Sequence, residues 1–171
     1  GRSDDQSSFL MTPPGERYDY AHFEFIMRGA RAAMERFPDK ADYISVSLHC
    51  ETADIMRAYT RLAEENPDLS GLAAYNAARP PHSEGLAIVI AAYLAHETQF
   101  PNINLLHLSS AKAIESAMLM AGTFPNINFR REATITHLMT DFEGAGSIYG
   151  KVNPPLRPHE DVEALWQAII D

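Results

Sequence analysis

Residues 43–49, Tyr-Ile-Ser-Val-Ser-Leu-His, and residues 103–107, Ile-Asn-Leu-Leu-His, are two short apolar runs that each end in a histidine. Runs of this length, rich in aliphatic and β-branched residues, are typical of buried β-strands. A histidine as the last residue of a buried strand, twice, is how a parallel α/β barrel presents metal ligands at the carboxyl ends of its strands. The pattern predicts an α/β fold in which His49 and His107 are candidate metal ligands. The same positions also suit two unrelated histidines that hydrogen-bond to nearby backbone.

The overall composition is that of an ordinary globular domain. The chain has 171 residues, 46% of them hydrophobic and 22% charged, which is enough for one sizeable core. The formal net charge of −9, with no cluster of Lys and Arg, disfavours nucleic acid and anionic membranes as partners. No run approaches the roughly 18 apolar residues that span a bilayer. The single cysteine, Cys50, excludes an internal disulfide and agrees with a reducing cytosol, so we expect a cytoplasmic location.

Helical patterns alternate with the two apolar runs. The expected elements are helices at 18–37, 52–65, 83–97, 111–122 and 159–170, strands at 43–48, 71–75, 103–107 and 127–138, and loops at 12–17 and 141–150. Strand and helix follow one another at the spacing of βαβ units. We therefore expect one domain, with residues 1–17 irregular and residues 18–171 forming about three or four β/α units.

The expected number of β/α units is smaller than that of a complete barrel. A closed barrel of eight β/α units needs roughly 250 residues. The chain therefore holds either an open sheet that is complete as it stands or about half of a (β/α)8 barrel of the TIM type, and we expect the part-barrel.

Four short motifs occur in a fixed order along the chain. They are His49-Cys-Glu-Thr52, Ala78-Arg-Pro-Pro81, His107-Leu-Ser-Ser110 and Val152-Asn-Pro-Pro-Leu-Arg157. From about residue 43 to residue 170 this combination resembles the cyclic amidohydrolases, the group of dihydroorotases, hydantoinases (dihydropyrimidinases) and allantoinases. Glu84, and Glu132 together with His137, also match the pattern of that family.

The resemblance implies a metal-dependent barrel that hydrolyses the amide bond of a small cyclic substrate. In the family two divalent ions, usually zinc, polarise the carbonyl and lower the pKa of a bridging water. His49 and His107 would then be ligands of the second metal, and Asn153 would bind the substrate. Arg157 would anchor the loop that carries Asn153. The family commonly forms dimers or tetramers, so a homo-oligomer is expected.

Several features of the family are absent from this sequence. No His-x-His pair occurs, and Ser8 stands where the family's bridging lysine is expected. The general-base aspartate of the family would lie beyond residue 171, so no catalytic residue is assigned. A catalytic zinc usually has about three protein ligands, and two histidines would hold an ion weakly. We expect this chain alone to be inactive, either as a piece of a longer amidohydrolase or as a diverged, metal-free relative.

A non-catalytic function is the alternative. A partial barrel would serve as a scaffold or interaction subunit, with two open sheet edges and an uncovered apolar inner face that favour association.

Overall fold

A computed structural model describes residues 19–170. The predicted loop at 12–17, and Ser8 at the position expected for the family's bridging lysine, lie outside the described residues. The helices are α1 (Tyr20–Arg36), α2 (Ala53–Glu64), α3 (Gly71–Ala77), α4 (Pro81–Glu97), α5 (Ala111–Thr123), α6 (Ile135–Met139) and α7 (His159–Ile170), with 3-10 turns η2 (Pro38–Tyr43) and η3 (Ile148–Gly150). The strands are β1 (Val46–Leu48), β2 (Asn102–Leu105) and β3 (Asn128–Arg131).

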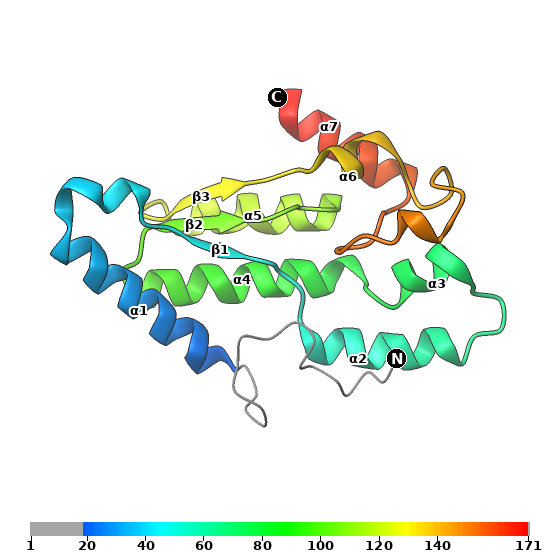
Figure 1. The fold of residues 1–171 in the computed structure, drawn as a ribbon, viewed down its shortest axis with the longest axis horizontal. Coiled ribbons are helices and arrows are strands. Elements are labelled where there is room, and N and C mark those ends of the chain that lie inside the picture. Colours follow the sequence, from blue (N-terminus) through cyan, green and yellow to red (C-terminus); the bar gives the residue numbers. More distant parts are fainter. Residues whose placement is uncertain (1–18, 171) are drawn as a thin grey trace.

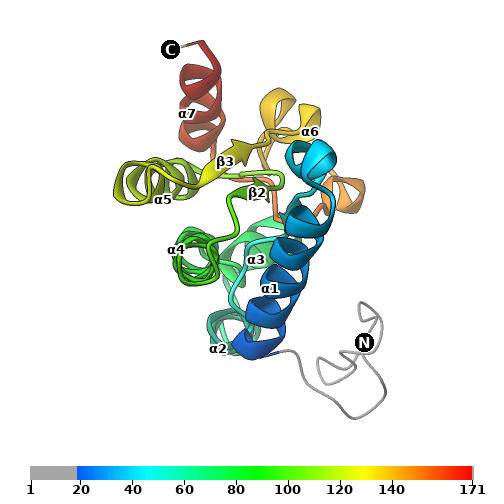
Figure 2. The same cartoon turned by 90° about the vertical axis from the view of Figure 1, so that its left-hand side faces the viewer.

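The three strands form one parallel sheet in the order β1-β2-β3, so that neighbours in space are also neighbours in sequence. The register places Val46 opposite Ile103, and Ile103 opposite Phe129. Helices α4 and α5 lie alongside each other and cover the same face of the sheet, as the two views in Figures 1 and 2 show. All strands therefore end at one edge, where the loops that follow them meet.

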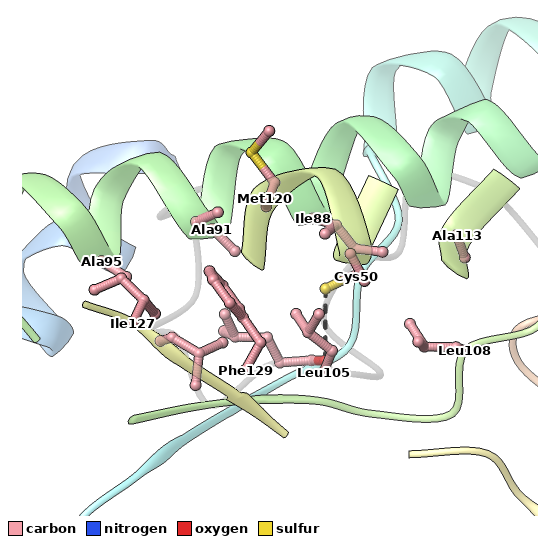
Figure 3. Packing of buried hydrophobic residues seen from close by; sticks show 14 of the residues in the cluster. Cys50, Ile88, Ala91, Ala95, Leu105, Leu108, Ala113, Met120, Ile127 and Phe129 are labelled. Carbon is pink, nitrogen blue, oxygen red and sulfur yellow. Dashed lines mark hydrogen bonds between the residues drawn. The ribbon is translucent and has the colours of Figure 1, made fainter. Parts of the chain in front are cut away.

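The hydrophobic core fills the space between the sheet and these two helices. Ile103 and Leu105 of β2 have no exposed surface, and Phe129 of β3 is 6% exposed. Figure 3 shows Leu105 and Phe129 on the side of the sheet that faces α4 and α5. The helix residues in this layer are mostly small, which lets the helices lie close to the strands: Ile88, Ala91, Ala92, Ala95, Ala113, Ala117 and Met120.

The opposite face of the sheet is polar. Ser47, Asn104 and Arg130 lie side by side across the three strands, and the first and last of these are exposed. The Asn104 side-chain amide donates to the hydroxyls of Ser45, at 3.2 Å, and Ser47, at 3.0 Å. Because successive residues of a strand point to opposite faces, the apolar residues all face the helices. The expectation of an apolar inner face is wrong for this part of the chain.

The predicted helices at 18–37, 52–65, 83–97, 111–122 and 159–170 are confirmed as α1, α2, α4, α5 and α7. The strand predicted at 71–75 is wrong, since these residues belong to helix α3. The strand predicted at 127–138 is correct only over β3, because Thr134 is the N-cap of the short helix α6, which occupies the end of that range. The loop predicted at 141–150 contains the turn η3.

Helix α7 buries only part of its apolar stripe. Val162 and Leu165 are buried, whereas Ile169 and Ile170 are 54% and 73% exposed. The Trp166 indole N–H donates to the carbonyl of Leu138 at 2.8 Å, which ties α7 to α6. Across residues 19–170, no helix combines the length and the apolar character needed to cross a membrane.

Candidate functional site

The two histidines predicted at strand ends lie in contact. His49 follows β1 directly, and His107 lies two residues after β2, whose pairing with β1 continues as the Leu106 N–H donates to the carbonyl of Leu48 at 3.1 Å. Nδ1 of His49 is 3.1 Å from Nε2 of His107. The ring centroids are 4.8 Å apart and the rings are inclined at 67°. Parallel neighbouring strands thus bring together two residues that are far apart in sequence.

The distance between the two nitrogens fits two ligands of one metal ion. With metal–nitrogen bonds of about 2.0–2.1 Å, ligands at a tetrahedral angle lie about 3.3 Å apart, and ligands at a right angle about 2.9 Å apart. The observed 3.1 Å lies between these values. It equally fits a hydrogen bond between the rings. In the part of the chain that the structure describes, no three His, Cys, Asp or Glu side chains are grouped to hold a metal, so these nitrogens form an incomplete ligand set.

The backbone at His107 is strained. Its φ is +39°, a region that residues other than glycine rarely adopt. Glu132, just after β3, accepts the His107 N–H at 3.2 Å through its side chain and the Leu108 N–H at 2.7 Å through its carbonyl.

The pKa of His107 is lowered, mainly because the ring is partly buried and to a lesser extent because His49 lies beside it. Both effects favour the neutral imidazole, which is the form that binds metals.

A buried carboxylate contacts the far side of His49. Oε2 of Glu51 lies 2.8 Å from Nε2 of His49, and Arg79 donates through Nη1 to the same oxygen at 2.8 Å. The Glu51 side chain is 1% exposed. Both residues stand in the motifs His49-Cys-Glu-Thr52 and Ala78-Arg-Pro-Pro81, but the sequence alone assigns them no role. The available signal was the carboxylate two residues after a strand-end histidine.

Arg157 anchors the loop that carries Asn153, as predicted from the motif. Its guanidinium is buried and donates to the Ser109 hydroxyl at 2.9 Å, to the Asn76 side-chain oxygen at 3.0 Å and to the carbonyl of Arg79. Ser109 belongs to the loop after β2 that begins with His107. The anchor therefore ties residues 151–157 to the carboxyl edge of the sheet, where Figure 1 shows this loop in orange.

The second member of this anchor is a buried acid, Glu84, in the first turn of α4. It is 1% exposed and accepts from the Ser109 N–H at 2.9 Å and from the Ser109 hydroxyl at 2.6 Å. Nη2 of Arg157 lies 3.6 Å from Oε2 of Glu84. Burial outweighs these contacts and raises the pKa of Glu84 to about 7.

Asn153 itself is exposed at the tip of the anchored loop. The two residues after it are fixed in place. Pro154 and Pro155 are fully buried, and Nε2 of His137 lies 3.0 Å from the carbonyl oxygen of Pro154. The other ring nitrogen of His137 lies 2.7 Å from the hydroxyl of Thr134. His137 therefore supports the loop directly after the exposed Asn153.

A pocket of about 340 Å³ lies on the helix side of His49. Its walls are largely apolar and come from α1, α4 and the residues after β1, including Phe23, Leu94 and Cys50. Cys50 is 3% exposed, and burial raises the pKa of its thiol to about 12. The thiol is therefore protonated and unreactive near neutral pH, and Cys50 acts as a small core residue.

Comparison with known proteins identifies related sequences. No protein-family profile matches the chain. It is 30% identical over 129 residues to the protein named probable allantoinase 2 of Dictyostelium discoideum, across 75% of this chain and 25% of that protein. It is 33% identical over 125 residues to a dihydroorotase of Thermococcus kodakarensis, across 71% of this chain and 25% of that protein. The chain thus spans about a quarter of the length of these relatives.

Solved structures show the same fold. The L-hydantoinase (dihydropyrimidinase) of Arthrobacter aurescens superposes with a TM-score of 0.75 at 22% identity, across 92% of this chain and 33% of that one. The D-hydantoinase (dihydropyrimidinase) of a Thermus species gives a TM-score of 0.74 at 20% identity, across 89% of this chain and 31% of that one. By its sequence relatives and its fold, the chain belongs to the cyclic amidohydrolase family, and it corresponds to a quarter to a third of a member's length.

Proposed function

We propose that this chain supplies one part of the active site of a metal-dependent hydrolase that opens a small cyclic amide. The observation that carries the proposal is the contact between His49 and His107, two side chains that the order of the strands brings to the same edge of the sheet. Related allantoinase and dihydroorotase sequences support the choice of a cyclic amide as substrate.

The sheet topology supports a part-barrel. In a (β/α)8 barrel, consecutive strands are parallel neighbours and every helix lies on the outside. A doubly wound sheet instead reverses its strand order and has helices on both faces. The order β1-β2-β3, with α4 and α5 on one face in Figure 2, agrees with a run of neighbouring strands from such a barrel. We infer that the polar face bearing Ser47 and Asn104 is the barrel interior.

The residues present fit part of a metal site. His49 would hold an ion through Nδ1 and His107 through Nε2, because these nitrogens face each other. When bound, a divalent ion, with zinc the default for histidine ligands, supplies Lewis acidity that polarises an amide carbonyl. Glu132 holds the turn that presents His107, by accepting two backbone N–H groups. A third ligand is needed, so we expect this chain alone to be inactive.

Asn153 is the proposed substrate-binding residue. An amide side chain has both an acceptor and donors, which complement the N–H and carbonyl of a ring amide. Arg157 and His137 fix the loop on either side of Pro154 and Pro155, so the exposed amide is held at the same edge as the histidines. A loop fixed in advance lowers the entropy cost of binding.

Titration of the purified chain with zinc, measured by isothermal titration calorimetry, tests the metal site. The chain should bind weakly with one site, and H49A and H107A should each abolish that binding. His159, whose side chain is 70% exposed, provides a matched control, and H159A should bind zinc as the parent does. Unchanged zinc binding by H49A and H107A would remove the basis of the proposal.

An interaction subunit is the second candidate function. The observation that favours it is a group of exposed apolar residues on α6 and α7: Ile135 is 69%, Met139 68% and Ile170 73% exposed. Exposed apolar surface of this kind marks association sites. Light scattering after gel filtration tests it, since I135E/M139E should convert a homo-oligomer to the 19.0 kDa monomer. A monomer already in the parent chain at high concentration would count against it.

A further inference from the structure

Four side chains form a continuous line of polar contacts through the proposed metal site. His107 contacts His49 at 3.1 Å, His49 contacts Glu51 at 2.8 Å, and Arg79 contacts Glu51 at 2.8 Å. The line runs from the exposed edge of the sheet inward, because His49 is 36% exposed and the Glu51 side chain only 1%. Each contact constrains where the protons of the next ring can be.

The end of this line at Glu51 is fixed. Arg79 donates to Oε2 of Glu51, so this oxygen belongs to a carboxylate that can only accept hydrogen bonds. The other oxygen, Oε1, is buried and has no partner among the described residues. The positive charge of Arg79 therefore has to offset the cost of burying this carboxylate. His49 must therefore donate its Nε2 proton to Glu51. A neutral imidazole carries one N–H, so its Nδ1 has a free lone pair.

The contact at the other end of the line agrees with this assignment. Nδ1 of His107 is buried and has no partner within residues 19–170. If His49 donated to His107, the proton of His107 would sit on that nitrogen, and a buried unpaired N–H is costly. The arrangement with fewer unmet groups has His107 donating from Nε2 to the lone pair on Nδ1 of His49. Both ends of the line therefore place the His49 proton on Nε2.

We propose that Glu51, held by Arg79, is a positioning residue that fixes His49 in the Nε2–H tautomer. In this tautomer the Nδ1 lone pair of His49 points toward Nε2 of His107, where the proposed metal ion would bind. The consequence for metal binding rests on the proposed function; the tautomer itself does not. A carboxylate behind a ligating histidine typically contributes about 10- to 100-fold in metal affinity. The same arrangement gives a role to a buried acid that lies two residues after His49.

Nuclear magnetic resonance of the metal-free chain with ¹⁵N-labelled histidines tests the tautomer directly. Long-range correlations distinguish an Nε2–H ring, an Nδ1–H ring and an imidazolium, and H49A assigns the signals. We expect the neutral His49 ring of the parent chain to be a single Nε2–H species, because Glu51 accepts at that nitrogen. E51Q keeps a carbonyl acceptor and should keep this pattern, whereas E51L removes the acceptor and should give exchange between tautomers.

Zinc titration of the same proteins gives the second measurement. E51L should bind zinc about 10- to 100-fold more weakly than the parent, and E51Q should recover part of this loss. The exposed Glu97 on α4 provides the control, since E97L should change neither measurement. If E51L fails to fold, R79M tests the same line, because an unpaired Glu51 should perturb the His49 signals.

The outcomes separate this inference from the proposed function. An Nδ1–H ring as the neutral form of His49 in the parent chain overturns the inference, whatever zinc does. So does an E51L variant that keeps both the single Nε2–H species and the parent affinity for zinc. A confirmed tautomer in a chain that binds no zinc would leave the inference standing and remove the proposed metal site.

Discussion

The buried Glu84 carboxyl predicts that part of the stability of the chain is lost as the pH rises. In the folded chain, burial raises the pKa of Glu84 from its ordinary value of 4.5 to about 7. Between these two values the folded chain keeps a proton that the unfolded chain releases, so raising the pH favours unfolding. The contribution is fully present below pH 4.5, falls until the pH reaches about 7, and is constant above that.

The size of the effect follows from the shift in pKa. At about 1.36 kcal/mol for each pH unit, the full loss is about 3 kcal/mol. Because the chain is expected to precipitate near its pI of about 5.2, measurements should begin above it. Roughly half of the loss, about 1–2 kcal/mol, falls between pH ~5.8 and pH ~8.

The substitution E84Q isolates this contribution, because glutamine does not titrate and its carbonyl still accepts from Ser109. His107 and His137 change stability in the opposite direction. Burial lowers the pKa of each, so their contribution is present above about pH 6.5 and is lost as the pH falls below it, through the lowered pKa of the folded chain. The quantity to compare is therefore the difference in unfolding free energy between E84Q and the parent. Urea unfolding followed by the fluorescence of Trp166, the sole tryptophan, measures it.

The free energy of unfolding of E84Q should rise relative to that of the parent by about 1–2 kcal/mol as the pH rises from ~5.8 to ~8. A difference that stays constant within about 0.5 kcal/mol over that range would refute the reasoning, because Glu84 would then titrate alike in the folded and unfolded chains.

Three further changes test the anchor, the core and a helix end. R157M leaves a buried carboxylate without its cation and should cost about 3–5 kcal/mol at pH ~8 in urea unfolding; a cost under ~1 kcal/mol would mean that the pair is not buried in solution. L105A removes a side chain with no exposed surface and should cost about 2–5 kcal/mol. Its control L119A, at a 63% exposed position, should stay within about 0.5 kcal/mol, and equal losses would place the core elsewhere. D161A removes the acceptor of the Ala111 N–H at the start of α5 and should lower the melting temperature, at a cost of about 1 kcal/mol; an unchanged melting temperature would contradict this contact.

The sequence predicts the long helices because their patterns are periodic over many residues. It predicts the strands from short apolar runs, and the runs at 43–48 and 103–107 correspond to the shorter strands β1 (Val46–Leu48) and β2 (Asn102–Leu105). It placed His49 and His107 at strand ends, and parallel pairing then brings them together without any local signal. It failed at 71–75, where an apolar run of a few residues carries too little periodicity to separate a strand from a helix. It also extended the strand beyond β3 past Thr134, where the backbone turns into α6.

The buried polar contacts that support the site could not be predicted from sequence for a different reason. Glu51 and Arg79 are separated by 28 positions and meet only because the loop after β1 and the loop before α4 lie at the same edge of the sheet. Likewise, Arg157 reaches Ser109 across 48 positions. Buried polar pairs of this kind depend on tertiary geometry, and the sequence shows only that charged residues stand in motifs.

The polar row of Ser47, Asn104 and Arg130 also bears on how this protein folds during synthesis. Chains emerge from the ribosome at about 5–20 residues per second, and hydrophobic surface exposed in the meantime promotes aggregation. Here the open face of the sheet is one that water can solvate, and the core cluster lies between the sheet and α4 and α5. Of α7, only Leu165 joins that cluster. The segment from β1 to β3 can therefore bury its core as soon as it has emerged, with no apolar sheet face awaiting a later partner.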